Sequence, residues 1–292
     1  MRRKEMADLL RRYSVRLNIL ARKIAARYDE EDIHDFRVLV KKLRAFIRLV
    51  SPAAGRRRLP KRLRLFYHAV GAIRNLQLQR AGLQKVIDGG HTKSVETLLG
   101  HLDEELAAAK MSAGKLLQPG ERPFGNLAAK LTAELPARID QGHRHRFLAA
   151  NSQVIDPTTF PQLPDDERLH TLRKSIKDLL YTWPWLGNRG RKLAAERLGG
   201  HKAMKKAGRL LGEYLDLRLK LQLLAGQDAA HGFYAHLRDD WAEERTTLRR
   251  QIDLSLGQKL HFATRPQIHP SDTPVNPLSG NTPSLSNELH LD

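Results

Sequence analysis

Cysteine is absent from the 292 residues of this chain, and aromatic residues make up only 6% of them. A chain without thiols forms no disulfide, which fits a reducing compartment. No apolar run approaches the roughly 20 residues of a membrane span, and the basic N-terminus lacks the continuous apolar segment of a secretory signal. We therefore expect a cytoplasmic protein with no membrane partner.

Acidic residues are scarce relative to basic ones. Lys and Arg number 51 against 32 Asp and Glu, which gives a formal net charge of +19. Net charge bears on partners and solubility and not on the fold. Such an excess calls for a polyanion: nucleic acid, an acidic membrane surface or an inorganic phosphate polymer.

Strand patterns are also missing, because no segment shows period-two alternation of useful length. Apolar residues recur at helical spacing instead. This predicts an all-α protein of eight helices, over 4–28, 29–50, 60–88, 92–117, 124–148, 165–183, 191–225 and 229–256. Pro136 should bend or interrupt the fifth helix, and we predict a loop over 151–164 and a turn over 187–190.

The eight helices divide into two groups of four, over residues 1–118 and 122–262. Pro, Ser, Asn and Thr dominate the remaining tail, residues 263–292. A tail with so few large apolar side chains cannot offset its ordering entropy, so we expect it to be disordered.

The segment 29–50 organises the chain, because much of its pattern is repeated 136 residues later. On a helix with about 100° per residue, its cations fall within an arc of about 80°, separate from the apolar arc. A charged stripe on a single helix is most simply a solvated face, whereas two copies favour a binding surface. The stripes are His34, Arg37, Lys41, Arg44 and Arg48 in the first copy and His170, Arg173, Lys174 and Lys177 in the second.

A second pair of helices carries aligned stripes at an offset of 141 residues. Each stripe continues into a mid-helix glycine, which costs about 1 kcal/mol relative to Ala. Either a ligand or another backbone passes close to the glycine, or two helices pack tightly there. Arg74, nearer the apolar arc, has no assigned role. The aligned positions are Lys61, Arg64, His68 and Gly71 in the third helix and Lys202, Lys205, Arg209 and Gly212 in the seventh.

These motifs resemble the signatures of the CHAD family, the conserved-histidine α-helical domain, over roughly residues 1–262. The sequence departs from the family pattern at Asn75, where the family usually has Asp, and at Leu215, which replaces an Arg before Asp216. The matching residues are His34, Arg37, Val38, Lys41, Lys42, Leu43 and Arg44, and then Leu169, His170, Leu172, Arg173, Lys174 and Lys177.

The resemblance implies two four-helix bundles related by a pseudo-two-fold axis, enclosing a basic central cavity or pore. It also implies binding of inorganic polyphosphate, association with polyphosphate granules, and no catalytic residue set. Polyphosphate has no base or aromatic face, so its receptor needs spaced cations, which Arg and Lys supply. The predicted binding residues are His34, Arg37, Lys41, Arg44, Arg48, Lys61, Arg64, His68, His170, Arg173, Lys174, Lys177, Lys202, Lys205 and Arg209.

Several alternatives remain open, as does the oligomeric state. We expect no metal at His34 or His170, because their stripe neighbours are cations, and no cofactor; phosphoryl transfer to these histidines has no accompanying acid, base or nucleotide loop. His143 and His145 are expected to form a solvated helix end. A nucleic-acid binder would need interleaved aromatics that the stripes lack, and an enzyme cleaving phosphoanhydrides would need a phosphate loop or clustered carboxylates for Mg²⁺.

Overall fold

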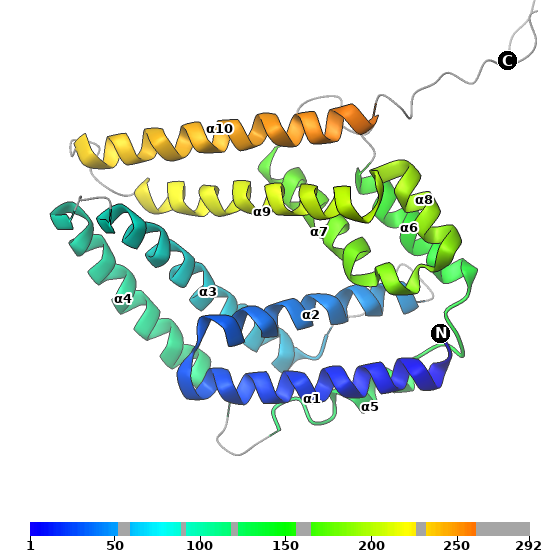
Figure 1. The fold of residues 1–292 in the computed structure, drawn as a ribbon. Helices are drawn as coiled ribbons and strands as arrows, with labels where there is room; N and C mark the ends of the chain where they lie inside the picture. The colour runs from blue at the N-terminus through cyan, green and yellow to red at the C-terminus, as the bar shows by residue number, and fades with distance from the viewer. Residues whose placement is uncertain (52–58, 89–91, 118–121, 156–164, 226–231, 261–292) are drawn as a thin grey trace, which may run out of the picture.

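The computed structural model describes residues 1–51, 59–88, 92–117, 122–155, 165–225 and 232–260. Within these ranges the chain forms ten α-helices, one short 3-10 helix and no β-strand (Figure 1). The prediction of an all-α protein is confirmed. None of these helices combines the length and the apolarity that crossing a bilayer requires. The tail 263–292, predicted to be disordered, lies outside the described residues.

The first four helices follow the predicted ranges closely. Asp29 caps the second of them by accepting hydrogen bonds from the backbone N–H groups of Glu31 and Asp32, at 2.9 and 3.0 Å. Tyr28 caps the end of the first helix, and its left-handed φ of 51° turns the chain back so that the first two helices pack together. These helices are α1 (Arg3–Arg27), α2 (Glu30–Val50), α3 (Lys61–Asp88) and α4 (Thr92–Gly114).

The second half differs from the prediction in where its helices break. The predicted helix 124–148 is two helices, because Pro136 lies in the interruption between them. The second of these continues to Ile155, so the predicted loop 151–164 is helical at its start. The elements are α5 (Leu127–Ala133), α6 (Gln141–Ile155), α7 (Asp166–Thr182), the 3-10 helix η2 (Trp183–Trp185), α8 (Gly187–Leu198), α9 (Gly200–Leu224) and α10 (Gly232–Leu260).

The predicted turn 187–190 and the predicted single helix 191–225 are both wrong. Helix α8 begins at Gly187 and ends where Gly199 and Gly200 take φ values of 70° and 80°. Glycine adopts such angles at little cost, so this pair makes the corner between α8 and α9. The described residues therefore form ten α-helices where eight were expected.

Buried apolar side chains form two clusters, and each cluster draws on both halves of the chain. The larger one packs α1, α2 and the start of α3 against α5 to α9, with Phe46 and Leu172 among its members. The smaller one joins the far ends of α3 and α9 to α4 and α10, through residues such as Leu83 and Leu217. The two halves thus share their cores. The division into two bundles about a pseudo-two-fold axis stays a prediction.

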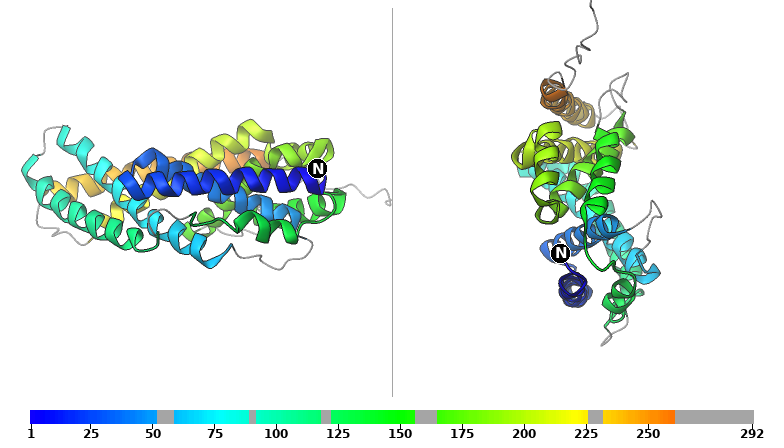
Figure 2. Two further views of the ribbon diagram at one scale, coloured as in Figure 1. Left: turned by 90° about the horizontal axis from the view of Figure 1, so that it is seen from below. Right: turned by 90° about the vertical axis from the view of Figure 1, so that its right-hand side faces the viewer.

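Four helices make a closed circuit of contacts, in which α2 packs on α3, α3 on α9, α9 on α7, and α7 on α2. Where the halves meet at one end, the rings of Phe46 and Trp185 lie 5.0 Å apart. At the other end, Gln79 Nε2 of α3 donates a hydrogen bond of 3.3 Å to the Leu219 carbonyl oxygen of α9. Figures 1 and 2 show α1 and α2 on one side of the molecule and α9 and α10 on the other, and in Figure 1 α3 runs from α2 towards α9.

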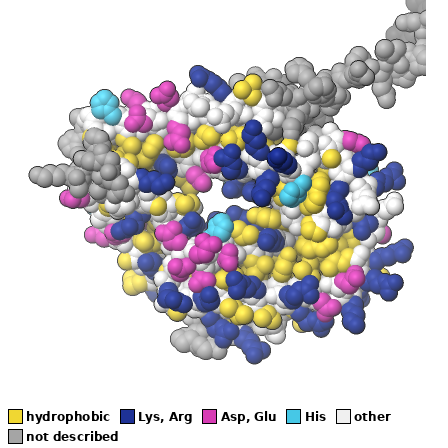
Figure 3. Space-filling view, viewed as in Figure 1, with side chains coloured by type: hydrophobic (Ala, Val, Ile, Leu, Met, Phe, Trp, Pro, Cys, Tyr) yellow, Lys and Arg dark blue, Asp and Glu magenta, His cyan; other side chains and the backbone are white. Residues whose placement is uncertain are grey.

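An opening lies between these two contact zones in the space-filling view (Figure 3). Lys and Arg side chains gather beside it, with Asp, Glu and His side chains also at its edge. The circuit of α2, α3, α9 and α7 surrounds the opening, so side chains on the inner faces of these four helices determine its charge.

Candidate anion-binding site

Arg37 of α2 is held against α3. Its Nη1 donates a hydrogen bond of 3.3 Å to the Tyr67 carbonyl oxygen, and its Cζ lies 4.9 Å from the centre of the Tyr67 ring. Arg44, two turns later on α2, lies over the same ring at 5.8 Å. A cation over an aromatic face is attracted by the ring quadrupole, so Tyr67 orients two predicted site residues at once.

Gly71 leaves the space that the Arg37 guanidinium occupies. A Cβ at position 71 would overlap Arg37 Nη1 and lie 3.3 Å from its Cζ. In the second half, Gly212 of α9 faces Arg173 of α7, whose Nη2 lies 3.4 Å from the corresponding Cβ position. From the sequence, two explanations of these glycines remained: a ligand or another backbone passes close to them, or two helices pack tightly there. The group that passes close is an arginine side chain of the facing helix, in both repeats.

The stripes of α2 and α7 converge. Lys41 is half-buried, and Arg37 on its own helix acts on it electrostatically. Arg173 and Lys177 act on it from α7. Burial, followed by these like charges, lowers the pKa of Lys41 to about 8. We call Arg37, Lys41, Arg173 and Lys177 the cationic cluster.

Lys177 experiences the same conditions as Lys41. Burial lowers its pKa, and Arg173 and then Lys205 of α9 add to the shift. Cations from three helices of the circuit therefore act on one another across a shared space. The two basic rows therefore face each other at their middle, around Lys41 and Lys177.

The histidines differ in their relation to this cluster. Burial, followed by Lys174 and other nearby cations, lowers the pKa of His170. His34 is exposed at the start of α2, and in the part of the chain that the structure describes it makes no hydrogen bond or ion pair with the cluster. The expectation of a solvated helix end is wrong for His143, which is buried with its Nδ1 2.7 Å from Asp140 Oδ1.

Arg48 pairs with a carboxylate of the protein. Its Nη1 forms a salt bridge with Asp178 Oδ2 of α7. Burial raises the pKa of Asp178, while Arg48, Arg44 and Lys174 act in the opposite direction. The pair ties α2 to α7, so Arg48 contributes to closing the circuit as well as to its charge.

The stripes of α3 and α9 lie further out. Lys205 reaches the cluster electrostatically through Lys177. Arg209 is exposed and pairs with Glu213 at 2.8 Å, one turn along α9. Within the described part of the chain, the other predicted residues of these stripes make no hydrogen bond or ion pair with the cluster: Lys61, Arg64, His68 and Lys202.

Three residues near the predicted cations were not among the predicted site residues. Arg74, which had no assigned role, forms a 2.6 Å salt bridge with Glu30 at the start of α2. Asp216 faces the cluster from α9, and Tyr67 orients two of its arginines. Tyr67 and Asp216 each lie one helical turn from one of the two glycines, so a search for rings and carboxylates at that spacing would have found both.

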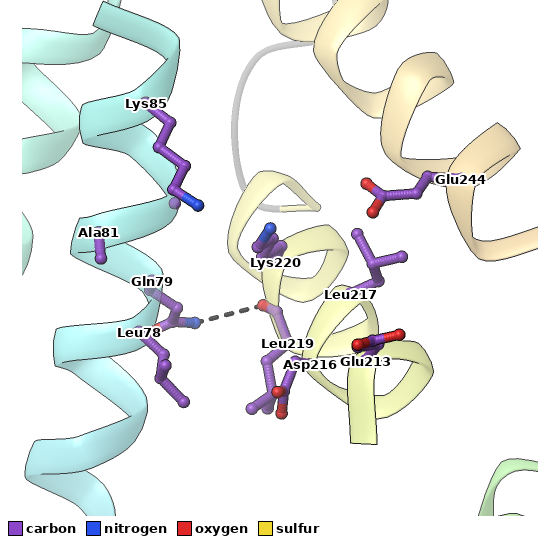
Figure 4. Close-up of a pocket in the computed structure, with 11 residues that line it drawn as sticks. Leu78, Gln79, Ala81, Lys85, Glu213, Asp216, Leu217, Leu219, Lys220 and Glu244 are labelled. Carbon is purple, nitrogen blue, oxygen red and sulfur yellow. Dashed lines mark hydrogen bonds between the residues drawn. The ribbon is translucent and has the colours of Figure 1, made fainter. Parts of the chain in front are cut away.

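Beside the cluster, α3 and α9 border a cavity of about 250 Å³ (Figure 4). Its lining has both signs of charge. The described residues include no group of three or more His, Asp or Glu side chains suited to hold a metal ion, and the expectation that no metal binds stays a prediction. The charged lining residues are Lys85 of α3, Glu213, Asp216 and Lys220 of α9, and Glu244 of α10.

Comparison with known proteins places these features in context. Residues 16–225 match the sequence pattern of a family described as the CHAD domain. The solved structures similar to this chain include the crystal structure of the CHAD domain from the plant Ricinus communis, with a TM-score of 0.63 and 17% sequence identity. The alignment covers 87% of this chain and 91% of that one. A search of curated proteins finds no significant match.

Lys41→Met should stabilise the protein at pH 7. Lys41 titrates near 10.5 in the unfolded chain and near 8 in the folded one, so the unfolded state binds more protons between these values and wild-type stability rises with pH through that window. Below it, the folded protein bears the full repulsion. We expect the melting temperature to rise by about 2–4 °C at pH 7, the shift that about 1 kcal/mol produces in a protein of this size.

Thermal unfolding at pH 7 and pH 10 measures this effect. The increase in melting temperature of Lys41→Met over wild type should be smaller at pH 10, because Lys41 is then neutral in the folded wild-type protein. Lys42→Met is the matched control, since Lys42 is the exposed neighbour on the same helix. Equal melting temperatures for the two variants at pH 7 would show that the cluster carries no repulsion at Lys41.

Proposed function

Because this chain belongs to the CHAD domain family, we propose that its cationic cluster binds inorganic polyphosphate without catalysis. The observation that supports this most is the convergence of four half-buried cations from two helices that are distant in sequence. The outer residues of the predicted site, from His34 to Arg209, extend the binding surface on either side. Such a protein would be found at polyphosphate granules in the cytoplasm.

The energetics of the empty site favour an anionic polymer. The cations of the cluster repel one another, so a bound phosphate chain gains attraction and also relieves repulsion within the protein. Arg37 is already oriented by Tyr67, which reduces the side-chain entropy lost on binding. An Arg fork can grip two phosphate oxygens, while Lys41 and Lys177 supply point charges between them.

A nucleic acid is a less suitable ligand for this site. Recognition of single strands uses aromatic faces on which bases stack. The Tyr67 ring, which lies beside the cluster, has Arg37 and Arg44 over it. Competition distinguishes the two ligands: RNA or DNA that displaced long-chain polyphosphate at equal phosphate concentration would overturn the proposal.

An enzyme that cleaves phosphoanhydrides is the other alternative. Such chemistry needs groups that stabilise the leaving phosphate and activate water, commonly with Mg²⁺ held by carboxylates. The proposal therefore predicts no release of orthophosphate from polyphosphate by the pure protein, with and without Mg²⁺. Sustained turnover would overturn the assignment of pure binding while leaving the site itself in place.

Lys41→Glu combined with Lys177→Glu should weaken polyphosphate binding by roughly 100-fold or more, since each hydrogen bond to a charged group contributes about 1.5–3 kcal/mol. Both substitutions lie in the cationic cluster, one on each converging helix. Titration with long-chain polyphosphate measures the affinity, and circular dichroism confirms that helix content is kept. Affinity should also fall steeply with salt, as for other polyanions that release counterions.

The matched control is Lys42→Glu combined with Lys206→Glu. Both lysines are exposed neighbours of predicted site residues, and the pair changes the net charge by the same amount. We expect the control to weaken binding less than about tenfold, through the long-range field alone. Equal losses in the two double variants would show that net charge and not the cluster drives binding.

Gly71→Ala should lower the affinity by about tenfold without loss of the fold. The new methyl group takes the place of the Arg37 guanidinium, which is the mobile end of a long side chain and moves away. Ala is the better helix former by about 1 kcal/mol, so stability should be kept. Gly212→Ala is the internal comparison, because Arg173 lies at ordinary contact distance there. It should change affinity less than about threefold.

These affinities come from the same polyphosphate titration. If Gly71→Ala and Gly212→Ala bound polyphosphate equally well, the seating of Arg37 on Gly71 would be irrelevant to binding. A melting temperature well below wild type for Gly71→Ala would instead indicate tight helix packing at this glycine.

A further inference from the structure

Asp216 is a carboxylate under the influence of positive charges on four helices. It is the carboxylate of α9 on which cations from all four helices of the circuit act electrostatically. The side chain is exposed to solvent, yet burial is the largest effect on its pKa, which is raised. A group that water reaches while protein surrounds it lines a recess. The four cations are Lys41 of α2, Arg74 of α3, Arg173 of α7 and Lys220 of α9.

Asp216 differs from the other carboxylates near the cluster. Glu30 and Asp178 each have an Arg nitrogen in direct contact. Among the described residues, Asp216 forms no side-chain hydrogen bond and no salt bridge within 4.0 Å, although its four cations act on it at longer range. The carboxylate therefore shares a space with the cations without being neutralised by any one of them. Figure 4 shows it on the cavity wall between α3 and α9.

We propose that Asp216 is a resident anion that competes with polyphosphate for the cluster, so that it sets the affinity of the site and takes up a proton when polyphosphate binds. This inference rests on the proposed function. In the empty protein, the carboxylate offsets part of the repulsion among the cations around it. A bound phosphate chain provides that compensation instead, and Asp216 is then a negative charge beside negative phosphates.

The direction of the proton linkage follows from these charges. Lys41, Arg74, Arg173 and Lys220 favour the ionised carboxylate in the empty site, against the desolvation that raises its pKa. A bound polyphosphate screens those cations and repels the carboxylate, so the pKa of Asp216 rises further. The bound state then binds more protons than the free state, and affinity increases as the pH falls.

Other titratable groups face the same space and must be separated from Asp216. Lys85 of α3, Glu213 of α9 and Glu244 of α10 line the cavity with it. His170 of α7 is near Lys41 and Arg173 and also gains a proton when an anion binds. A substitution at Asp216 leaves all of these groups in place, so the difference from wild type isolates its contribution.

The competition has a consequence for ligand choice. Asp216 raises the dissociation constant of every anion at the centre of the cluster by a similar factor. Anions with few other contacts, such as orthophosphate, then bind too weakly to occupy the site. A long chain still binds, because it makes further contacts along α2 and α7. The same acid that weakens binding therefore restricts the site to long polyanions.

The test is calorimetric titration with long-chain polyphosphate at pH 7.5 and pH 5.0, in two buffers of different ionisation enthalpy. Internal phosphates stay ionised at both values, so the ligand contributes almost no protons. Asp216→Asn should bind about 3- to 10-fold more tightly than wild type at pH 7.5. The difference in affinity between Asp216→Asn and wild type should be smaller at pH 5.0. On binding polyphosphate at that pH, the variant should take up fewer protons than wild type.

Glu244→Gln is the matched control, because it removes one negative charge from the same cavity wall but lies on α10, outside the circuit of helices that carries the four cations. It should retain the wild-type affinity and pH profile. If it matched Asp216→Asn, the effect would be one of net charge and the inference would be overturned. Equal or weaker binding by Asp216→Asn at pH 7.5 would overturn it too.

Failure of this inference is distinguishable from failure of the proposed function. If wild type binds polyphosphate and Asp216→Asn shows the same pH profile, only the role of Asp216 is lost. If wild type does not bind polyphosphate at all, the function itself fails. Asp216→Ser provides a second neutral replacement should the Asn variant not fold, and it is held to the same outcomes.

Discussion

Mutual repulsion among positive side chains is the constraint on which the rest of this structure depends. Arg37, Lys41, Arg173 and Lys177 lie on two helices that are packed together although their facing charges have the same sign. Apolar burial supplies the opposing force, because both hydrophobic clusters draw on both halves of the chain and hold the circuit closed. The site is thus assembled against its own electrostatics.

The protein moderates this repulsion without removing it. Arg48 is paired with Asp178, and Arg74 with Glu30. Tyr67 draws two arginines over its ring. Each of these contacts neutralises a cation at the edge of the site or fixes its direction. In the described structure, the central lysines, Lys41 and Lys177, are half-buried and form no ion pair with a carboxylate. A polyanion would complete what these devices begin, which is the physical basis of the proposed function.

The internal repeat places a glycine against an arginine of the facing helix in both halves, but the two contacts differ in distance. Gly71 with Arg37 and Gly212 with Arg173 are equivalent pairs, but the first leaves no room for a methyl group and the second leaves ordinary contact distance. The halves also differ in their acids, since Asp216 has Asn75 as its counterpart in the first copy. The opening is therefore asymmetric in charge although its parent pattern is duplicated.

The features of this protein that depend on local interactions could be predicted from its sequence. Helix class follows from apolar spacing, the start of α2 from Asp29 and its acidic turn, and the cationic stripes from the 100° rotation per residue. Breaks at Gly199 and Gly200 were missed, because whether a glycine bends a helix depends on packing around it. Only the tertiary structure decided which stripe residues meet: Lys41 and Lys177 converge, whereas Lys61 and Lys202 have no described link to them. Convergence depends on how the helices cross, and that is set by long-range burial which no single segment encodes.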